Sequence, residues 1–338
     1  MDNRSNSGRS GVALTGRSMH GDVANSEVGQ VTIVMYHYVR PLARTRFPDI
    51  KGLDLEDFRA QIELIDRHYE VISLPQLIGA IDGEHALPEN AALLTFDDGY
   101  ADHYDYAMPI LDEHGISGIF FPPVTVVRER RVLDVNKIHF ILASGIDIHK
   151  LIKRMHAHLR NYRDEYNLPA EKSLFERYAA ASRFDPKEVI YVKRLLQKGL
   201  PEKVRSAIVD ALFTDIVTRD EEAFAEELYM SEDQLRYALG NGFFVGGHGV
   251  EHVWLDSLHL QKKKKEIVQS KQFLMDLGVP KSILSIAYPY GAWDKEVHQL
   301  AKILNFRAGF TTDVDVANVG LYDSLLLPRC DTNDLLVQ

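Results

Sequence analysis

The sequence contains very little cysteine, no long apolar run and no excess of positive charge. Its one cysteine, Cys330, cannot form an internal disulfide, which favours a reducing compartment. No apolar stretch reaches the ~18 residues that a membrane-spanning helix needs, so we expect no membrane span. The formal net charge of −10 argues against general nucleic-acid binding.

The first 30 residues contain no apolar core of the kind that a signal peptide has. Residues 1–30 are rich in Ser, Gly and Asn, and we expect a largely disordered N-terminal tail. Together with the single thiol, this predicts a cytoplasmic protein. The chain as a whole has 45% hydrophobic and 26% charged residues, which is typical of a globular enzyme.

Beyond the tail, strand-like and helix-like segments alternate. Short apolar runs predict strands at residues 31–36, 91–96, 118–121 and 283–288, with further short strands near 310 and 326. Apolar residues at helical spacing predict helices at residues 55–67, 74–81, 102–114, 260–277 and 295–304. This alternation favours an α/β fold whose parallel sheet is either open or closed into a barrel.

One long segment, residues 128–240, departs from the alternation. It is poor in Gly and Pro, it contains amphipathic helical patterns, and Pro186 and Pro201 mark expected helix starts. We interpret it as a helical insertion after the third strand, beside the carboxyl ends of the strands. It could serve as a lid or substrate-recognition subdomain, or equally as a dimerisation or stability element.

The most informative motif is the run TFDDG at residues 95–99. An apolar strand ends there in two adjacent carboxylates, Asp97 and Asp98. Burying carboxylates costs several kcal/mol unless something compensates them, and a cation is the usual compensator. Because strand carboxyl ends face the ligand crevice in α/β folds, these residues are candidate site residues.

A second motif, HGVEH at residues 248–252, offers further metal ligands. His248 and His252 stand four residues apart, so on a helical turn they would share one side and could hold one ion. Two imidazoles and one carboxylate leave positions open for water and substrate, as catalytic zinc or cobalt sites require. The alternative is a strand-end turn with two surface histidines, but the two motifs together favour a site.

These motifs resemble those of a known family. Residues 95–99 look like the first signature of the NodB-homology polysaccharide deacetylases, carbohydrate esterase family 4. Residues 248–252 are similar to its second signature, and residues 287–291 (AYPYG) resemble its third. The run MYH at residues 35–37 is also common in these proteins.

The resemblance covers residues of about 31–122 and 240–330. It implies a distorted (β/α)7 barrel over residues 31–338, interrupted by the helical insertion at 128–240.

The resemblance also implies a role for each matching residue. Asp97 would be the general base, and Asp98, His248 and His252 would hold a divalent metal. We expect zinc, with cobalt, nickel or manganese as alternatives. The backbone N–H of Tyr290 would lie in the oxyanion hole.

The sequence departs from the family pattern at three positions. Gly249 replaces a Ser or Thr that would brace the second motif, and Ala287 replaces the Arg of the third motif. Where the family's last motif has a His that supplies the general acid, this chain has Arg329.

Arg remains protonated near neutral pH and is a poor proton donor. We therefore predict an exchange in which Arg329 orients Asp97, while another residue supplies the acid. His37, at the end of the first strand, is the best candidate for the acid, although it could instead be a hydrogen-bonded strand-end histidine.

The resulting hypothesis is a metal-dependent hydrolase that removes an N-acetyl or N-formyl group from an amino sugar. The expected partner is an N-acylated amino sugar or glycan precursor in surface-polysaccharide synthesis, such as lipopolysaccharide biosynthesis. Alternatives are a cyclic imide or ureide hydrolase and a catalytically impaired glycan-binding protein. A structural role, with oligomerisation through the insertion, is a further alternative.

Overall fold

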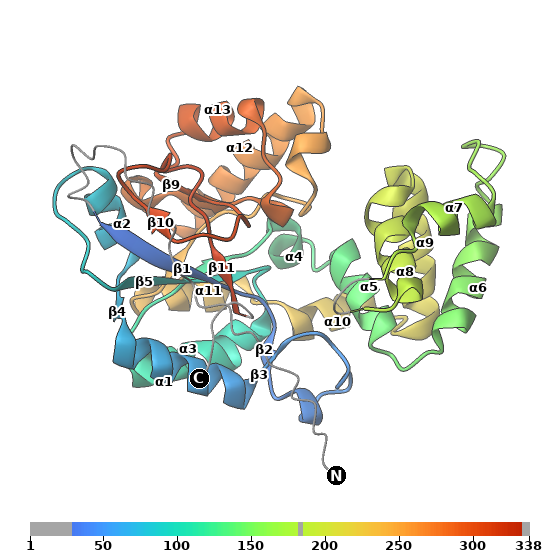
Figure 1. Cartoon of the computed structure of the whole chain (residues 1–338), viewed down its shortest axis with the longest axis horizontal. Coiled ribbons are helices and arrows are strands. Elements are labelled where there is room, and N and C mark those ends of the chain that lie inside the picture. The colour runs from blue at the N-terminus through green and yellow to red at the C-terminus, as the bar shows by residue number, and fades with distance from the viewer. Residues whose placement is uncertain (1–28, 182–184, 333–338) are drawn as a thin grey trace, which may run out of the picture.

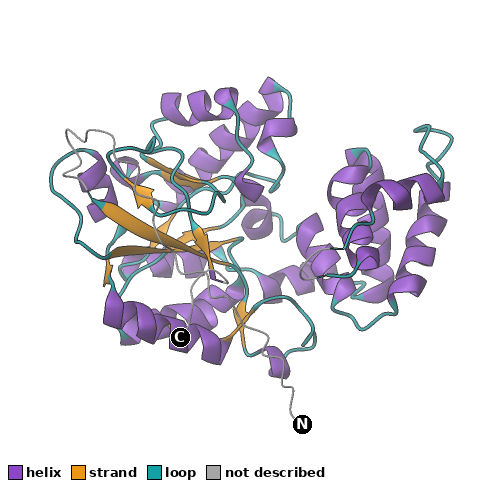
Figure 2. Ribbon diagram, viewed as in Figure 1, coloured by secondary structure: helices purple, strands orange, loops and turns teal. Residues whose placement is uncertain are grey.

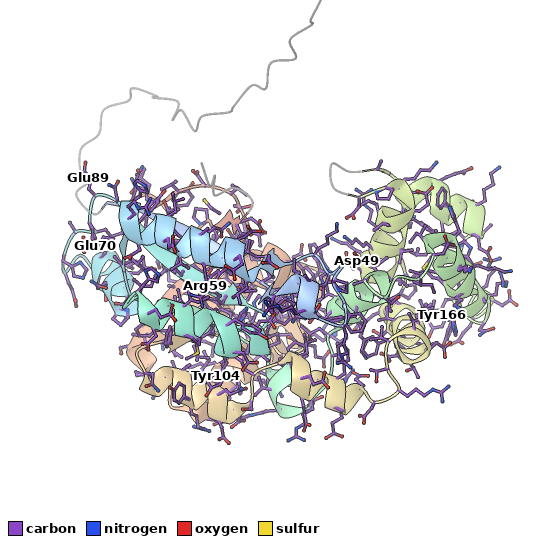
Figure 3. All side chains as sticks on the ribbon, turned by 90° about the horizontal axis from the view of Figure 1, so that it is seen from below. Asp49, Arg59, Glu70, Glu89, Tyr104 and Tyr166 are labelled. Carbon is purple, nitrogen blue, oxygen red and sulfur yellow. The ribbon has the colours of Figure 1, made fainter. Side chains whose placement is uncertain are left out.

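The computed structural model describes residues 29–181 and 185–332, so the predicted tail at 1–30 lies almost wholly outside the described residues. The chain forms an α/β part and a separate lobe of helices (Figures 1 and 2). Seen from below, the lobe with Tyr166 lies on the opposite side of the molecule from Glu70 and Arg59, and Asp49 lies between the two parts (Figure 3).

The α/β part is built on a ring of parallel strands. Strand β1 pairs with β5, β5 with β6, and β6 with β7, all parallel. The ring continues through a bridge between Gly247 and Ile286, the parallel pair β8 and β9, and a bridge between Phe310 and Leu327. Strand β11 then pairs with β1. The bounds of these strands are β1 Gln30–Tyr36, β5 Ala91–Asp97, β6 Ile119–Phe121, β7 Phe244–Val245, β8 Ser285–Ala287, β9 Ala308–Phe310 and β11 Cys330–Asp331.

This ring of seven strands is the distorted (β/α)7 barrel that the family resemblance implied. The central strand β5 is covered on both faces, since every one of its residues is buried. Four short strands lie outside the ring: β2 Val39–Arg40, β3 Leu53–Asp54, β4 Glu70–Val71 and β10 Ala317–Asn318.

Helices cover the outside of the ring. They are α1 Leu55–His68, α2 Leu74–Ile81, α3 Met108–Glu113, α4 Val124–Arg128, α11 Glu232–Gly240, α12 Leu260–Leu277 and α13 Lys295–Ile303. The expected helix at 102–114 is instead a π-helical turn, His103–Ala107, followed by α3. Pro109 near the start of α3 has no N–H to donate to the preceding turn, which explains the change of helical pitch.

The helical lobe follows α4, and Leu151, Tyr191 and Leu212 are fully buried in its hydrophobic cluster, which also includes Tyr38 and Tyr100 of the barrel part. Its helices are α5 Asp134–Leu142, α6 Ile148–Arg160, α7 Glu171–Tyr178, α8 Lys187–Arg194, α9 Glu202–Ile216 and α10 Glu221–Leu228. Pro186 and Pro201 are the N-caps of α8 and α9, so the predicted helix starts are confirmed. None of the helices in the described residues is long and apolar enough to cross a bilayer.

Candidate active site

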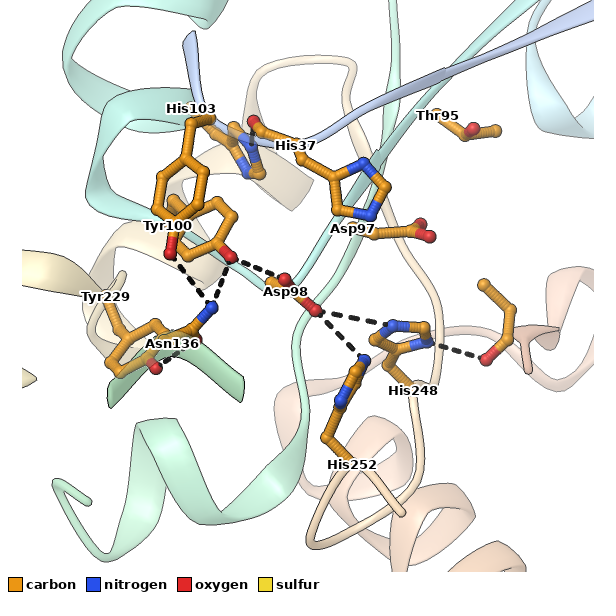
Figure 4. Close-up of polar contacts among 12 residues, drawn as sticks. His37, Thr95, Asp97, Asp98, Tyr100, His103, Asn136, Tyr229, His248 and His252 are labelled. Carbon is orange, nitrogen blue, oxygen red and sulfur yellow. Dashed lines mark hydrogen bonds and ion pairs between the residues drawn. The ribbon is translucent and has the colours of Figure 1, made fainter. Parts of the chain in front are cut away.

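The carboxyl ends of the barrel strands bring together most of the residues that the motifs single out (Figure 4). Asp97 is the last residue of β5 and Asp98 follows it. His37 follows β1, while His248 and Tyr290 lie in the loops after β7 and β8. Residues far apart in the sequence therefore meet at one end of the barrel, where ligands bind in this class of fold.

Asp97 forms a buried, bidentate ion pair with Arg329. Nη1 of Arg329 donates to Oδ1 of Asp97 at 2.8 Å, and Nη2 donates to Oδ2 at 2.7 Å. The guanidinium also donates to the Thr311 carbonyl at 2.8 Å and to the Thr95 hydroxyl at 3.2 Å. The predicted contact between Arg329 and Asp97 is thus confirmed. Burial raises the pKa of Asp97, but Arg329 and His248 outweigh it and hold the pKa below its usual value.

Asp98, His248 and His252 form a compact group beside this pair. All three are buried, and their candidate ligand atoms lie within 4.8 Å of one another. Oδ1 of Asp98 is 3.2 Å from Nε2 of His252 and 3.6 Å from Nε2 of His248. Nδ1 of His248 lies 2.7 Å from the Ala287 carbonyl, which assigns its proton to Nδ1 and leaves a lone pair on Nε2.

The group fits a divalent cation. Oδ1 of Asp98 is buried and accepts no hydrogen bond from any residue that the structure describes. Burial lowers the pKa of His252 to about 4, so this imidazole is neutral near pH 7 and can offer a lone pair. Two imidazole nitrogens that face one carboxylate oxygen without a hydrogen-bond donor form a donor set that zinc prefers.

The loop that carries the two histidines differs from the expectation. Residues 248–252 form no helical turn, and the imidazoles converge because Gly249 and His252 have positive φ values of 71° and 50°. The buried Glu266 carboxylate braces the loop by accepting from the N–H groups of Val250 at 2.6 Å and Glu251 at 3.1 Å.

Glu266 also explains the departure at position 249. A Cβ there would lie 3.0 Å from Oε2 of Glu266, and the backbone would be strained with any side chain. The bracing that the family's hydroxyl would supply comes instead from Glu266 on α12. No local pattern around position 266 points to this residue, since the contact depends on how α12 packs.

Tyr290 lies in the turn after β8 with φ of 58°. Its ring stacks on Trp254 at a centroid distance of 4.4 Å and contacts the His252 ring edge-on at 4.6 Å. Asp98, with φ of 70°, and His252 share this left-handed conformation. Such strained residues persist where the surroundings over-determine them, and they often cluster at functional sites.

His37 is half-buried, and its imidazole is directed toward Asp97 (Figure 4). Its carbonyl oxygen lies 2.8 Å from Nε2 of His103, which fixes the backbone at the end of β1. The side chain lines a cleft of about 490 Å³ together with Tyr38 and Tyr100. The structure therefore places all seven sequence-predicted residues around one centre.

The barrel strands present two histidines and paired carboxylates at their carboxyl ends, where enzymes with parallel barrels have their active sites. Comparison with known families identifies the family. The polysaccharide deacetylase family matches residues 84–158 and 214–309, about half of the chain. The chain belongs to this family. The unmatched stretch between the two segments lies in the helical lobe.

Individual relatives agree with this assignment. YxkH of Bacillus subtilis strain 168, which is named as a polysaccharide deacetylase, is 26% identical over 127 residues, or 37% of this chain and 43% of YxkH. The chain thus matches less than half the length of this relative.

Solved structures share the fold at low identity. The Streptococcus pyogenes deacetylase PplD, in complex with acetate, aligns with a TM-score of 0.53 and 16% identity over 89% of this chain and 92% of its own. IcaB from Ammonifex degensii aligns with a TM-score of 0.52 and 16% identity over 89% and 90%.

The first prediction concerns the buried ion pair. We expect Arg329→Met to lower the free energy of unfolding by about 3–5 kcal/mol, because it leaves the Asp97 carboxylate buried and unpaired. Urea unfolding at pH 7 measures this change. Arg307, whose Nη2 donates to both carboxylate oxygens of Asp82 in a partly exposed pair, provides a control. Arg307→Met should cost less than about 1 kcal/mol. Equal losses in the two variants would contradict the prediction.

Proposed function

We propose that the protein is a metal-dependent hydrolase that removes an N-acetyl, or alternatively an N-formyl, group from an amino sugar. One observation carries the proposal. The Asp97–Arg329 pair lies directly beside the donor set of Asp98, His248 and His252, at the carboxyl ends of the barrel strands.

In this proposal Asp98, His248 and His252 hold a divalent ion, with zinc as the first choice and cobalt, nickel or manganese as alternatives. Such an ion, when bound, acts as a Lewis acid that polarises the amide carbonyl and lowers the pKa of water. The buried and ordered donor set supports this assignment.

The remaining residues handle protons and charge. Asp97 takes a proton from the attacking water, and Arg329 keeps its carboxylate ionised and aimed. His37, whose imidazole is directed toward Asp97 (Figure 4), gives a proton to the leaving amine. The N–H of Tyr290 donates to the oxyanion, a role that its left-handed turn beside His252 supports.

The alternative of a catalytically impaired glycan-binding protein rested on the missing Arg and the missing acid. The bidentate pair supports a functional base, because Arg329, directly before β11, reaches the Asp97 carboxylate. No observation favours a cyclic imide or ureide hydrolase.

The cleft supports a small substrate. His37 and Tyr100 line its barrel side, whereas His139 of α5 and Lys193 of α8 line its insertion side. A site walled on both sides suits a defined ligand better than a long polymer. We therefore propose a nucleotide- or lipid-linked N-acyl amino sugar of surface-polysaccharide synthesis, such as lipopolysaccharide assembly. The single thiol supports a cytoplasmic enzyme.

The second prediction tests the metal site. His252→Ala should weaken zinc binding by more than the about 10–100-fold that loss of an outer-sphere partner costs. Isothermal titration calorimetry measures the affinity, and circular dichroism checks that the barrel remains folded. His149→Ala, at an exposed histidine in the helical lobe, should leave zinc binding unchanged. Unaltered zinc affinity in His252→Ala would remove this residue from the site.

The third prediction separates binding from chemistry. Asp97→Asn should retain zinc but lower kcat by about 10²–10⁴-fold, the usual contribution of a general base. Acetate release at saturating substrate measures kcat, and metal analysis of the same sample serves as the control. Turnover close to that of the wild type would show that Asp97 is not the base.

The fourth prediction concerns the substrate. The zinc-loaded protein should release acetate from UDP-N-acetyl sugars faster than from chitin or peptidoglycan oligomers, because the insertion narrows the cleft. A coupled acetate assay compares the kcat/KM values. Acetate release from the polymers alone would contradict the small-substrate assignment.

A further inference from the structure

A chain of buried hydrogen bonds runs from the helical lobe to Asp98 (Figure 4). Asn136 of α5 is completely buried, and its Nδ2 donates to the hydroxyls of Tyr38 at 2.9 Å and Tyr100 at 2.7 Å. Its Oδ1 accepts from the hydroxyl of Tyr229, just after α10. The Tyr100 hydroxyl in turn donates to Oδ2 of Asp98. The lobe therefore reaches a candidate metal ligand through a single tyrosine.

Asn136 fixes the direction of every proton in this chain. The Tyr229 oxygen accepts from the N–H of Leu133 at 3.1 Å, so its own proton is available to Oδ1 of Asn136. The two protons of the Asn136 amide then point to Tyr38 and Tyr100. Because a tyrosine hydroxyl has only one proton, Tyr100 receives from Asn136 and gives its proton to Asp98.

This arrangement orients the Asp98 carboxylate. With Oδ2 held by Tyr100, Oδ1 faces the two imidazole Nε2 atoms. The tyrosine rings are themselves held in place, because Tyr38 stacks on Tyr100 at a centroid distance of 4.0 Å and Tyr100 stacks on Tyr229 at 6.0 Å. The hydrogen bonds and the stacked rings together hold the Tyr100 hydroxyl against Asp98.

We propose that Asn136 is a positioning residue for Asp98, acting through the Tyr100 hydroxyl, and that the helical lobe is thereby part of the metal site. The inference rests on the proposed function, since it takes Asp98 as a metal ligand. It assigns the lobe a role at the site that neither a separate dimerisation element nor a distant lid would have.

A double-mutant cycle on zinc affinity tests the inference without any substrate. Tyr100→Phe keeps the ring and removes the donor, and it should weaken zinc binding by about 10–100-fold. Asn136→Ala should weaken zinc binding in the same direction by a smaller factor. In the Tyr100→Phe background, Asn136→Ala should have little further effect, because the connecting hydroxyl is already absent. Calorimetric titration with zinc gives all four dissociation constants.

Tyr191→Phe provides the matched control. It removes another buried tyrosine hydroxyl of the lobe, one that lies 2.8 Å from Nε2 of His156 and has no link to Asp98. This variant should keep the zinc affinity of the wild type. Asn136→Leu, which keeps the branched heavy-atom skeleton and removes the amide, replaces Asn136→Ala if that variant does not fold.

Two results would overturn the inference. One is an unchanged zinc affinity in Asn136→Ala, and the other is an effect of Asn136→Ala that adds in full to that of Tyr100→Phe. Either result would leave the proposed function intact. A wild-type protein that binds no divalent ion and releases no acetate would instead refute the proposed function itself.

Discussion

The burial of the Arg329 guanidinium is the constraint on which the active end of the barrel depends. A charge with no exposure to solvent is tolerated only when it is paired and its N–H groups are satisfied. Asp97, Thr95 and the Thr311 carbonyl meet this requirement together. Since Arg329 directly precedes β11, which pairs with β1, closure of the ring and formation of the ion pair require each other.

The sequence predicts those parts of the site that depend on neighbouring residues in the chain or on the need to pair a buried charge. Asp97 and Asp98 end a strand, so their position follows from the strand itself. The Arg329 contact was predictable because a buried base lacking its usual partner needs another cation. The loop at 248–252 was predicted wrongly as a helical turn, because its shape depends on Gly249 and on Glu266 from a distant helix.

The same distinction applies to the helical lobe. Amphipathic patterns and two prolines sufficed to predict its helices, since these signals act within one or two turns. The contribution of Asn136 to the site could not be predicted in this way. An asparagine in the first turn of a helix is an ordinary surface feature, and only the packing of α5 against Tyr38 and Tyr100 buries its amide. Tyr100, by contrast, directly follows the TFDDG motif, so the sequence alone could have identified it as a candidate site residue.

The two adjacent carboxylates, for which we propose different tasks, have different partners in the fold. Asp97 closes the regular strand β5 and is held by Arg329 from the C-terminal end of the chain. Asp98 has φ of 70°, which breaks the strand and directs its carboxylate away from that guanidinium, toward Tyr100 and the histidines. One carboxylate therefore faces a permanent cation, while its neighbour keeps an oxygen with no donor. This difference in environment is the physical basis for assigning the base to Asp97 and the metal to Asp98.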